Sequence, residues 1–295
     1  MYLPHFGYHA PKTSAEALDL INCLGKKAKL LAGGTDLLIM MKEKLIRPEY
    51  LIDINSIEEI KNLSYKPDEG AVIGAAVKIS EVENSPLIKE KYYALHQAAG
   101  ELGSVQVRTM ATIGGNSCHA SPAAETPTPL VALGAKVILG SSAGKRELPL
   151  EEFILGNRLT ALKDGEMLTH FILPDPAPRS ASRYRYIGLR DAMEIDAVNM
   201  AVYLVLDQDG KTIKDLKLTM GSVSPRPLVS VEAPKALIGK EFGSELLDKA
   251  VEAVSSEAKP ISDIRASSEY RREMTKVLAH RLLQEAYNAA RGVSI

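Results

Sequence analysis

The chain has 295 residues, a formal net charge of −1 and two cysteines. This length allows two domains and a sizeable hydrophobic core. Because 36 basic residues nearly balance 37 acidic ones, the charge does not point to nucleic acid or an anionic membrane as a partner. The N-terminus lacks a basic segment followed by an apolar one, and no run approaches the roughly 18 apolar residues of a membrane span. We therefore expect a cytoplasmic protein without a membrane span.

The cysteine count limits the cofactors that the chain can bind. Cys23 and Cys118 cannot by themselves hold a structural zinc or an iron–sulfur cluster, which usually need about four ligands. A disulfide between them is an alternative that a reducing compartment disfavours, and we expect Cys118 to be a small buried residue rather than a nucleophile. We expect no metal site, and any redox chemistry would need an organic cofactor.

The first 56 residues predict a small βαβ unit. Thr13 and Glu16 form a capping box that starts a helix, which stops at Gly25. A strand, a crossover helix and a second strand then follow within few residues, which predicts a parallel pair of strands. We expect a strand over residues 29–31, a helix over 37–45 capped by Thr35 or Asp36, and a strand over 51–54.

Residues 57–176 predict a second α+β unit. The proline cluster over residues 174–178 breaks the last strand and marks a domain boundary. The expected elements are a helix over 87–102, a short helix over 130–133, and strands over 71–75, 136–139 and 166–173.

Residues 177–295 predict a C-terminal α+β unit with little obvious chemistry of its own. Two helices close the chain, and helical spacing in the last one places Tyr270 and Leu278 on its buried face and Arg271 outside. The expected strands cover 184–187, 197–206 and 213–220, and a turn at 207–210 joins the last two into an antiparallel hairpin.

Two glycine pairs, Gly33-Gly34 and Gly114-Gly115, carry the candidate chemistry. Each pair follows a strand-like lead and precedes a side chain with a hydrogen-bonding head, Thr35 or Asn116. Glycines between a strand and a helix expose backbone N–H groups that suit a phosphate. A lone Gly-Gly is more often a plain tight turn, but two such segments could grip a pyrophosphate from opposite sides. Neither segment is a Walker A or a G-x-G-x-x-G motif.

The polar residues near the glycine pairs allow other roles. A carboxylate beside a phosphate is electrostatically unfavourable, so we assign Asp36 to helix capping or to a ribose hydroxyl and take Thr35 as the better phosphate donor. Ser117, His119 and Glu125 suggest a hydrolase triad, but no nucleophile-elbow pattern surrounds them. We expect His119 to supply hydrogen bonds instead.

Three segments stand in a fixed order along the chain: Ala32-Gly33-Gly34-Thr35-Asp36-Leu37, Thr112-Ile113-Gly114-Gly115-Asn116, and Ala120-Ser121-Pro122-Ala123-Ala124-Glu125-Thr126-Pro127. Together they resemble the FAD-binding medium subunit of the molybdenum hydroxylases, the family of xanthine dehydrogenase and carbon monoxide dehydrogenase. The similarity runs the whole length of the chain and includes Arg47-Pro48, Val107-Arg108 and Glu269-Tyr270-Arg271.

The resemblance implies a flavin fold of the vanillyl-alcohol-oxidase (PCMH) type. Residues 1–56 and 57–176 would form two FAD-binding subdomains, and residues 177–295 a C-terminal α+β domain. FAD is implied to lie between the two subdomains, with its pyrophosphate between the two glycine pairs, Ser121 and Glu125 on its ribityl and adenosine side, and Leu168 against the flavin ring. The residues implied to bind FAD are Leu31, Ala32, Gly33, Gly34, Thr35, Asp36, Thr112, Ile113, Gly114, Gly115, Asn116, Ser121, Glu125, Leu168 and Tyr186.

Two positions depart from the family pattern. Glu125 stands where the family usually has aspartate, so its contact with the cofactor is expected to be longer or absent. Tyr186 stands where the family often has a lysine near the flavin, and a tyrosine cannot supply that positive charge to a reduced anionic flavin. Glu194, by contrast, keeps the acidic residue that commonly follows Ala-Met.

The resemblance also implies partners. The chain would be an oxidoreductase subunit beside a small iron–sulfur subunit and a large molybdopterin subunit, passing electrons from the clusters through FAD, usually to NAD⁺. Because the cofactor carries this chemistry, we expect no catalytic acid–base pair on the chain. A stand-alone flavin oxidoreductase of the same fold and a non-catalytic nucleotide-binding scaffold remain as alternatives. The substrate would be chosen by the molybdenum subunit.

Overall fold

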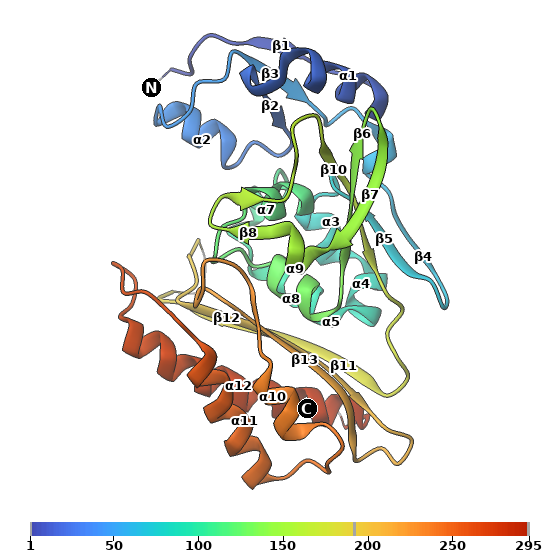
Figure 1. Ribbon diagram of the computed structural model, residues 1–295, viewed down its shortest axis with the longest axis vertical. Helices are drawn as coiled ribbons and strands as arrows, with labels where there is room; N and C mark the ends of the chain where they lie inside the picture. Colours follow the sequence, from blue (N-terminus) through green and yellow to red (C-terminus); the bar gives the residue numbers. More distant parts are fainter. Residues whose placement is uncertain (1, 191–192, 294–295) are drawn as a thin grey trace.

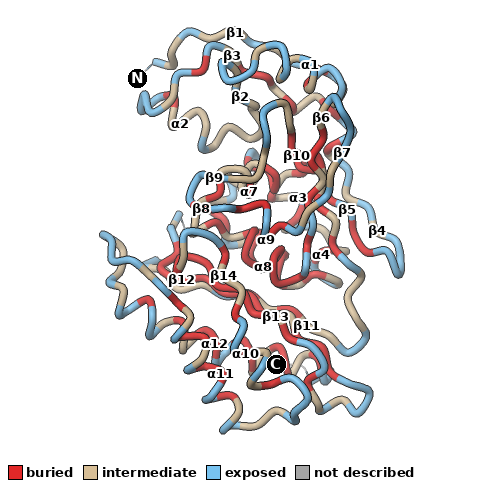
Figure 2. The backbone as a smooth tube through the Cα atoms, viewed as in Figure 1, coloured by how far each residue is buried: buried red, intermediate tan, exposed pale blue. Residues whose placement is uncertain are grey.

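Three large β-sheets follow one another along the long axis of the computed structural model (Figure 1). The structure describes residues 2–190 and 193–293. The first sheet lies at the N-terminal end, the second in the middle and the third at the C-terminal end, and helices pack beside each of them. Figure 2 shows that the buried backbone is concentrated in the second and third sheets and in the helices that pack on them.

The first sheet confirms the predicted βαβ unit. Its elements are β1 (Gly7–His9), α1 (Ser14–Leu24), a 3-10 turn (Gly25–Lys27), β2 (Ala28–Leu31), α2 (Leu37–Lys42) and β3 (Tyr50–Asp53). The strands are parallel in the order β1-β3-β2, with Leu30 opposite Ile52. The helix α2 is shorter than predicted, because Lys44 takes a left-handed conformation with φ of 63° soon after its end.

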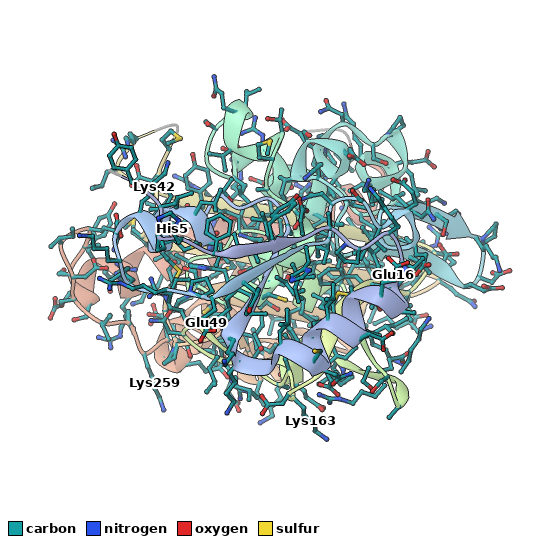
Figure 3. All side chains as sticks on the ribbon, turned by 90° about the horizontal axis from the view of Figure 1, so that it is seen from above. His5, Glu16, Lys42, Glu49, Lys163 and Lys259 are labelled. Atoms are coloured by element: carbon teal, nitrogen blue, oxygen red, sulfur yellow. The ribbon has the colours of Figure 1, made fainter. Side chains whose placement is uncertain are left out.

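The helix α1 starts where its capping signal predicts. The hydroxyl of Thr13 accepts a hydrogen bond from the amide of Glu16 at 3.2 Å, which satisfies one of the free N–H groups of the first turn. Figure 3 looks onto this end of the molecule, where the exposed side chains of Glu16, Lys42 and Glu49 project outward.

The second sheet is antiparallel, in the order β4-β5-β10-β6-β7. Its strands are β4 (Leu63–Lys66), β5 (Gly70–Gly74), β6 (Lys136–Ser141), β7 (Gly144–Pro149) and β10 (Met167–Leu173), and a small hairpin of β8 (Ile154–Gly156) and β9 (Leu159–Thr160) lies beside it. The helical segments of this region are a 3-10 turn (Glu58–Ile60), α3 (Ile79–Asn84), α4 (Pro86–Lys91), α5 (Tyr93–Glu101), α6 (Val105–Arg108), α7 (Ile113–His119), α8 (Pro127–Ala132) and α9 (Leu150–Phe153).

Two predicted helices of this region differ from the structure. The single helix expected over 87–102 consists of α4 and α5, because Tyr92 leaves the helical conformation with φ of −131° and ψ of 54°. The helix expected over 130–133 begins earlier, at Pro127. Proline is tolerated in a first helical turn, where the missing N–H would have no partner in any case.

The third sheet lies between two layers of helices. The helices α5 and α8 pack on one face, and the C-terminal helices pack on the other (Figure 1). The strands are antiparallel in the order β11-β12-β13-β14, which confirms the predicted hairpin, with Val202 opposite Leu218. The elements are β11 (Ser180–Ile187), β12 (Val198–Leu206), β13 (Ile213–Gly221), β14 (Leu228–Val229), α10 (Glu232–Leu237), α11 (Ser244–Glu257) and α12 (Ser268–Ala290).

The last helix, α12, buries a face slightly rotated from the predicted one. Leu278 is buried as expected, but Tyr270 is 43% exposed and Arg271 only 3% exposed. The expectation that Arg271 points outward is therefore wrong. Its guanidinium donates hydrogen bonds to the carbonyl oxygens of Ala197 and Ser222, which makes burial of the charge tolerable.

Each of the three predicted units holds one large sheet. The limits of these units at residues 56 and 176 stay a prediction. No helix in the described part of the chain is long and apolar enough to cross a membrane.

Candidate functional site

The structure brings the first glycine segment (residues 32–36) directly against the chain just before the second. A Cβ atom at Gly33 would lie 2.3 Å from the carbonyl oxygen of Met110 and 2.7 Å from the Cα of Ala111. Both neighbours are backbone atoms that cannot rotate away, so only glycine permits this approach. Gly34 has φ of +73° and turns the chain into α2.

The second glycine segment (residues 112–116) forms the first turn of α7. The hydroxyl of Thr112 accepts a hydrogen bond from the amide of Gly115 at 3.0 Å. A Cβ atom at Gly114 would lie 2.6 Å from atoms of Ala75, so this glycine lets α7 pack closely at the end of β5. The expected strand-like lead is wrong, because the helix α6 precedes this segment.

Gly115 differs from Gly114 in what surrounds it. A Cβ atom there would meet the hydroxyl of Thr112 at 2.9 Å, and no other described atom outside its own helix and chain neighbours lies within 4 Å. The hydroxyl is the movable end of a side chain. The direction in which a Gly115 side chain would point is therefore open, as it would be where a glycine makes room for a ligand.

The first glycine segment carries a run of free backbone donors. Within residues 2–190 and 193–293, no group accepts a hydrogen bond from the amides of residues 33–36. Successive unpaired N–H groups at a turn make a concave site for an anion. Asp36 does not cap α2 through its side chain, so the capping role expected for Asp36 or Thr35 is wrong.

The hydrolase triad that the sequence argues against does not assemble. The hydroxyl of Ser117 is fully buried and has no hydrogen-bond partner in the described structure. The imidazole of His119 lies elsewhere, with Nε2 3.8 Å from Oδ1 of Asp36. This contact is longer than a hydrogen bond, so the hydrogen-bonding role expected for His119 stays a prediction. Burial raises the pKa of the Cys118 thiol to about 12, so this cysteine is held as a thiol.

Two further residues of this region were missed by the sequence reasoning. Asn55, just after β3, donates from Nδ2 to the carbonyl oxygen of Ala32 at 2.7 Å. Lys78, just before α3, donates from Nζ to Oδ1 of Asn55 at 3.0 Å and to the carbonyl oxygen of Met110 at 3.1 Å. We call this pair the Lys78–Asn55 bridge, because it connects the first glycine segment to Met110, two residues before the second. The only signal for these two residues in the sequence was that each is a polar residue directly after an apolar run.

The segment after α7 places two more predicted residues near the second glycine segment. Oδ1 of Asn116 accepts a hydrogen bond from the hydroxyl of Thr126 at 2.6 Å, and a hydrogen bond with Asn116 also reaches Glu125. The hydroxyl of Ser121 accepts from the amide of Ala123 at 3.3 Å. These contacts order the loop that carries Ser121 and Glu125.

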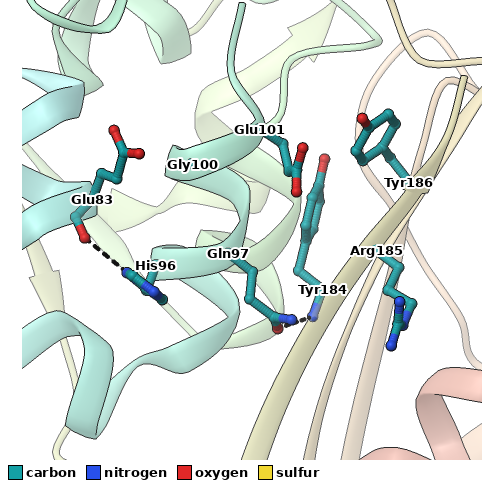
Figure 4. Close-up of a pocket in the computed structure, with 8 residues that line it drawn as sticks. All are labelled: Glu83, His96, Gln97, Gly100, Glu101, Tyr184, Arg185 and Tyr186. Carbon is teal, nitrogen blue, oxygen red and sulfur yellow. Dashed lines mark hydrogen bonds between the residues drawn. The ribbon is translucent and has the colours of Figure 1, made fainter. Parts of the chain in front are cut away.

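Leu168 and Tyr186 lie on strands of two different sheets. Leu168 is 3% exposed, stands next to a bulge in β10 and belongs to the core of the second sheet. Tyr186 lies on β11 at a cavity between α5 and β11 (Figure 4). The cavity is lined by Glu83, His96, Gln97, Gly100, Glu101, Tyr184, Arg185 and Tyr186.

Buried carboxyl groups lie where α5 and α8 meet the third sheet. Burial raises the pKa of Glu125, and the charge of Asp196 raises it further. Burial also raises the pKa of Asp196, although Oδ2 of Asp196 accepts hydrogen bonds from the hydroxyl of Tyr184 at 3.2 Å and from Nδ2 of Asn199 at 3.0 Å. A carboxyl with a raised pKa is protonated more readily in the folded chain than in water.

Asp196→Asn is expected to flatten the pH dependence of stability. A raised pKa means that the contribution of Asp196 is fully present below its ordinary pKa of 3.8 and is lost as the pH rises through the folded-state pKa. Because one oxygen accepts both hydrogen bonds, asparagine can keep them without ionising. Urea unfolding should show the variant about 1–2 kcal/mol more stable than the wild type at pH 8 and equal to it near pH 4.

Asp248→Asn is the control for this prediction, because Asp248 is an exposed carboxylate on α11. It should leave the stability unchanged at both pH values. The prediction is contradicted if the difference in free energy of unfolding between Asp196→Asn and the wild type is the same at pH 4 and pH 8.

Two family profiles match the chain. The FAD binding domain in molybdopterin dehydrogenase matches residues 4–176, and the CO dehydrogenase flavoprotein C-terminal domain matches residues 182–286. The chain therefore belongs to the family of FAD-binding medium subunits of the molybdenum hydroxylases.

Individual relatives are similar to this chain in sequence over nearly its whole length. The carbon monoxide dehydrogenase medium chain of Hydrogenophaga pseudoflava is 32% identical over 289 residues, which cover 97% of this chain and 99% of that protein. The xanthine dehydrogenase FAD-binding subunit of Escherichia coli O157:H7 is 30% identical over 288 residues, which cover 97% of each chain. Both are relatives of this chain in sequence.

Solved structures give the same result for the fold. A chain of carbon monoxide dehydrogenase from Hydrogenophaga pseudoflava matches with a TM-score of 0.93 and 32% identity, covering 99% of both chains. A chain of quinoline 2-oxidoreductase from Pseudomonas putida 86 matches with a TM-score of 0.92 and 26% identity, covering 99% of this chain and 100% of that one. The predicted family, the α+β flavoprotein fold, the class of oxidoreductase subunit and FAD as the cofactor are confirmed.

Proposed function

We propose that the diphosphate of FAD binds between the first and second glycine segments. The observation that carries this proposal is the run of four amides, at residues 33–36, without an acceptor in the described structure. The surroundings of Gly115 support it, since a Cβ atom there would meet only the Thr112 hydroxyl, at 2.9 Å, and no backbone atom outside its own helix and chain neighbours within 4 Å. Backbone N–H groups and glycines are the donor set that a diphosphate needs, so the residues present fit the cofactor.

The remaining roles follow from this placement. Thr35 and Asn116 are proposed to donate hydrogen bonds to the cofactor, with Leu31 and Ile113 packing beside the two segments. Ser121 and Glu125 are proposed to lie on its ribityl and adenosine side. Leu168 and Tyr186 are proposed to lie near the flavin ring. No residue of this chain is assigned an acid–base step, because these side chains bind, orient and shield the cofactor.

We further propose that the chain is the electron-transfer subunit of a molybdenum hydroxylase complex. Its partners would be a small iron–sulfur subunit and a large molybdopterin subunit, as the word "medium" in the names of its relatives suggests. Bound FAD would supply the redox chemistry, accepting electrons from the partner's 2Fe–2S clusters and reducing NAD⁺ or another acceptor. The chain would hold the flavin where both the cluster and the acceptor can reach it.

The electron path is tested by adding NADH to the purified FAD-loaded chain without oxygen. If NAD⁺ is the physiological acceptor, NADH should bleach the visible absorption of the flavin by the reverse reaction. Bleaching by the reduced iron–sulfur subunit but not by NADH would keep the electron-transfer role and assign another acceptor. A flavin that neither donor reduces would favour the non-catalytic scaffold. Turnover of a substrate by the chain alone would favour the stand-alone enzyme.

A further inference from the structure

We propose that Lys78 and Asn55 are positioning residues that hold the two glycine segments at the spacing required by FAD. The proposal rests on the placement of the diphosphate between these segments. It concerns two side chains outside both glycine motifs, which form a continuous chain of hydrogen bonds from Ala32 in the first segment to Met110, two residues before the second.

The Lys78–Asn55 bridge begins and ends at the atoms that define the contact between the segments. At one end, Asn55 holds the carbonyl oxygen of Ala32, the residue directly before Gly33. At the other end, Lys78 holds the carbonyl oxygen of Met110, the atom nearest to the place that a Cβ atom of Gly33 would take. A shift of either segment would therefore break a hydrogen bond of the bridge.

The orientation of the Asn55 amide is fixed by its other partners. Oδ1 of Asp53 accepts from the backbone amide of Asn55 at 2.8 Å and from its Nδ2 at 2.7 Å. Oδ2 of Asp53 in turn accepts from the hydroxyl of Tyr8. A flipped amide would turn the Nδ2 group toward the Lys78 ammonium, and two donors that face each other cannot form a hydrogen bond. Asn55 thus presents one fixed acceptor to Lys78 and one fixed donor to Ala32.

The contacts of the Lys78 ammonium do not suggest that it is there to stabilise the fold. Within the described chain, no carboxylate lies within ion-pair distance of Nζ, and its two acceptors are uncharged oxygens. Burial lowers its pKa, which reflects the cost of removing a cation from water. One of its three N–H donors has no acceptor in the described protein. A partly buried cation held by two neutral oxygens is better explained by a positioning role than by its contribution to stability.

The experiment compares Lys78→Met, Asn55→Ala and the double variant as full-length apo-proteins. The FAD dissociation constant is measured by titration of flavin absorbance, and the melting temperature is measured without FAD. Each single variant should bind FAD about 10- to 100-fold more weakly. The FAD dissociation constant of the double variant should exceed that of the more impaired single variant by no more than about 3-fold, because both side chains act through one bridge. The apo melting temperature should fall by no more than about 4 °C.

Lys66→Met is the matched control, because Lys66 is an exposed lysine of the second sheet whose ammonium pairs with Glu69 at 3.2 Å and does not contact either glycine segment. It should change the FAD dissociation constant by less than about 2-fold. If Lys78→Met fails to fold, Asn55→Ala provides the same test.

Three results would overturn the proposal. The first is wild-type FAD affinity in Lys78→Met. The second is additive losses in the double variant, which would mean that the two side chains act separately. The third is a fall in apo melting temperature large enough to account for the lost affinity, which would assign a purely structural role. If Gly115→Ala also leaves FAD affinity unchanged, the placement of the diphosphate fails as well; a loss in Gly115→Ala alone leaves the placement standing and rejects only the bridge.

Discussion

Gly115→Ala is expected to weaken FAD binding by about 100-fold or more and to change the stability of the apo-protein by no more than about 1 kcal/mol. Its Cβ atom would displace the Thr112 hydroxyl, 2.9 Å away, from its capping position and would lie beside the second glycine segment, where we place the diphosphate, and a close-packed ligand cannot move aside. A factor of 100 corresponds to about 2.7 kcal/mol. Inside α7, alanine instead gains about 0.5–1 kcal/mol over glycine from its helix propensity. Flavin titration and urea unfolding of the apo-protein separate the two effects.

Two other glycines serve as comparisons for this variant. Gly156→Ala should change neither FAD binding nor stability, because a Cβ atom there meets nothing within 4 Å. Gly33→Ala should lose both, because its Cβ atom collides with the backbone of Met110 and Ala111. Wild-type affinity in Gly115→Ala would place the diphosphate away from the second glycine segment.

Arg271→Met is expected to destabilise the protein by about 3–5 kcal/mol. The guanidinium donates to the carbonyl oxygens of Ala197 at 2.6 Å and Ser222 at 3.1 Å, and to Oδ1 of Asp263 at 2.8 Å. Methionine fills a similar volume but leaves these three acceptors without their donor, and the carboxylate loses its charge partner. Urea unfolding at neutral pH measures the effect.

Arg272→Met is the matched control, because the neighbouring Arg272 is exposed on the same helix. It should change the free energy of unfolding by less than about 0.5 kcal/mol. Equal stability of the two variants would show that the hydrogen bonds of Arg271 add little to the fold. A loss in Arg271→Met that is present at neutral pH and disappears at low pH, where Asp263 is protonated, would instead assign the effect to Asp263 alone.

The elements that could be predicted are those with strong local signals. Thr13 and Glu16 predicted the start of α1, and the apolar runs at residues 29–31 and 51–54 predicted the parallel strands β2 and β3. The break at Tyr92 could not be predicted, because the apolar pattern continues through it and only the backbone conformation changes. Local pattern is informative about element type and much weaker about where an element stops.

Arg271 shows why a buried charge is missed. The buried positions of α12, among them Arg271, Thr275, Leu278 and Leu282, follow the helical period. A period of apolar residues alone favours Tyr270 over Arg271, since charged residues are almost never fully buried unless paired. The partners that allow its burial lie on loops at residues 197, 222 and 263, far away in sequence.

For the candidate site, the sequence predicted the two glycine segments and could not predict how each glycine acts. Gly33 and Gly114 allow one backbone to approach another, whereas a Cβ atom at Gly115 would meet only the side-chain hydroxyl of Thr112. The Lys78–Asn55 bridge was missed because its two side chains have no motif of their own. They matter only through the carbonyl oxygens of Ala32 and Met110, which tertiary structure brings together.

The meeting of Gly33 with Met110 has a consequence for how the holoprotein is assembled. The first glycine segment lies beside the first sheet and the second beside the second sheet, so a diphosphate held by both exists only after the two sheets have docked. Cofactor loading and docking are then one linked equilibrium. At 100 times the dissociation constant, free FAD would favour the docked state by about 2.7 kcal/mol. The concentration of free FAD during synthesis would thus influence how much of the chain has its N-terminal sheet docked on the second sheet.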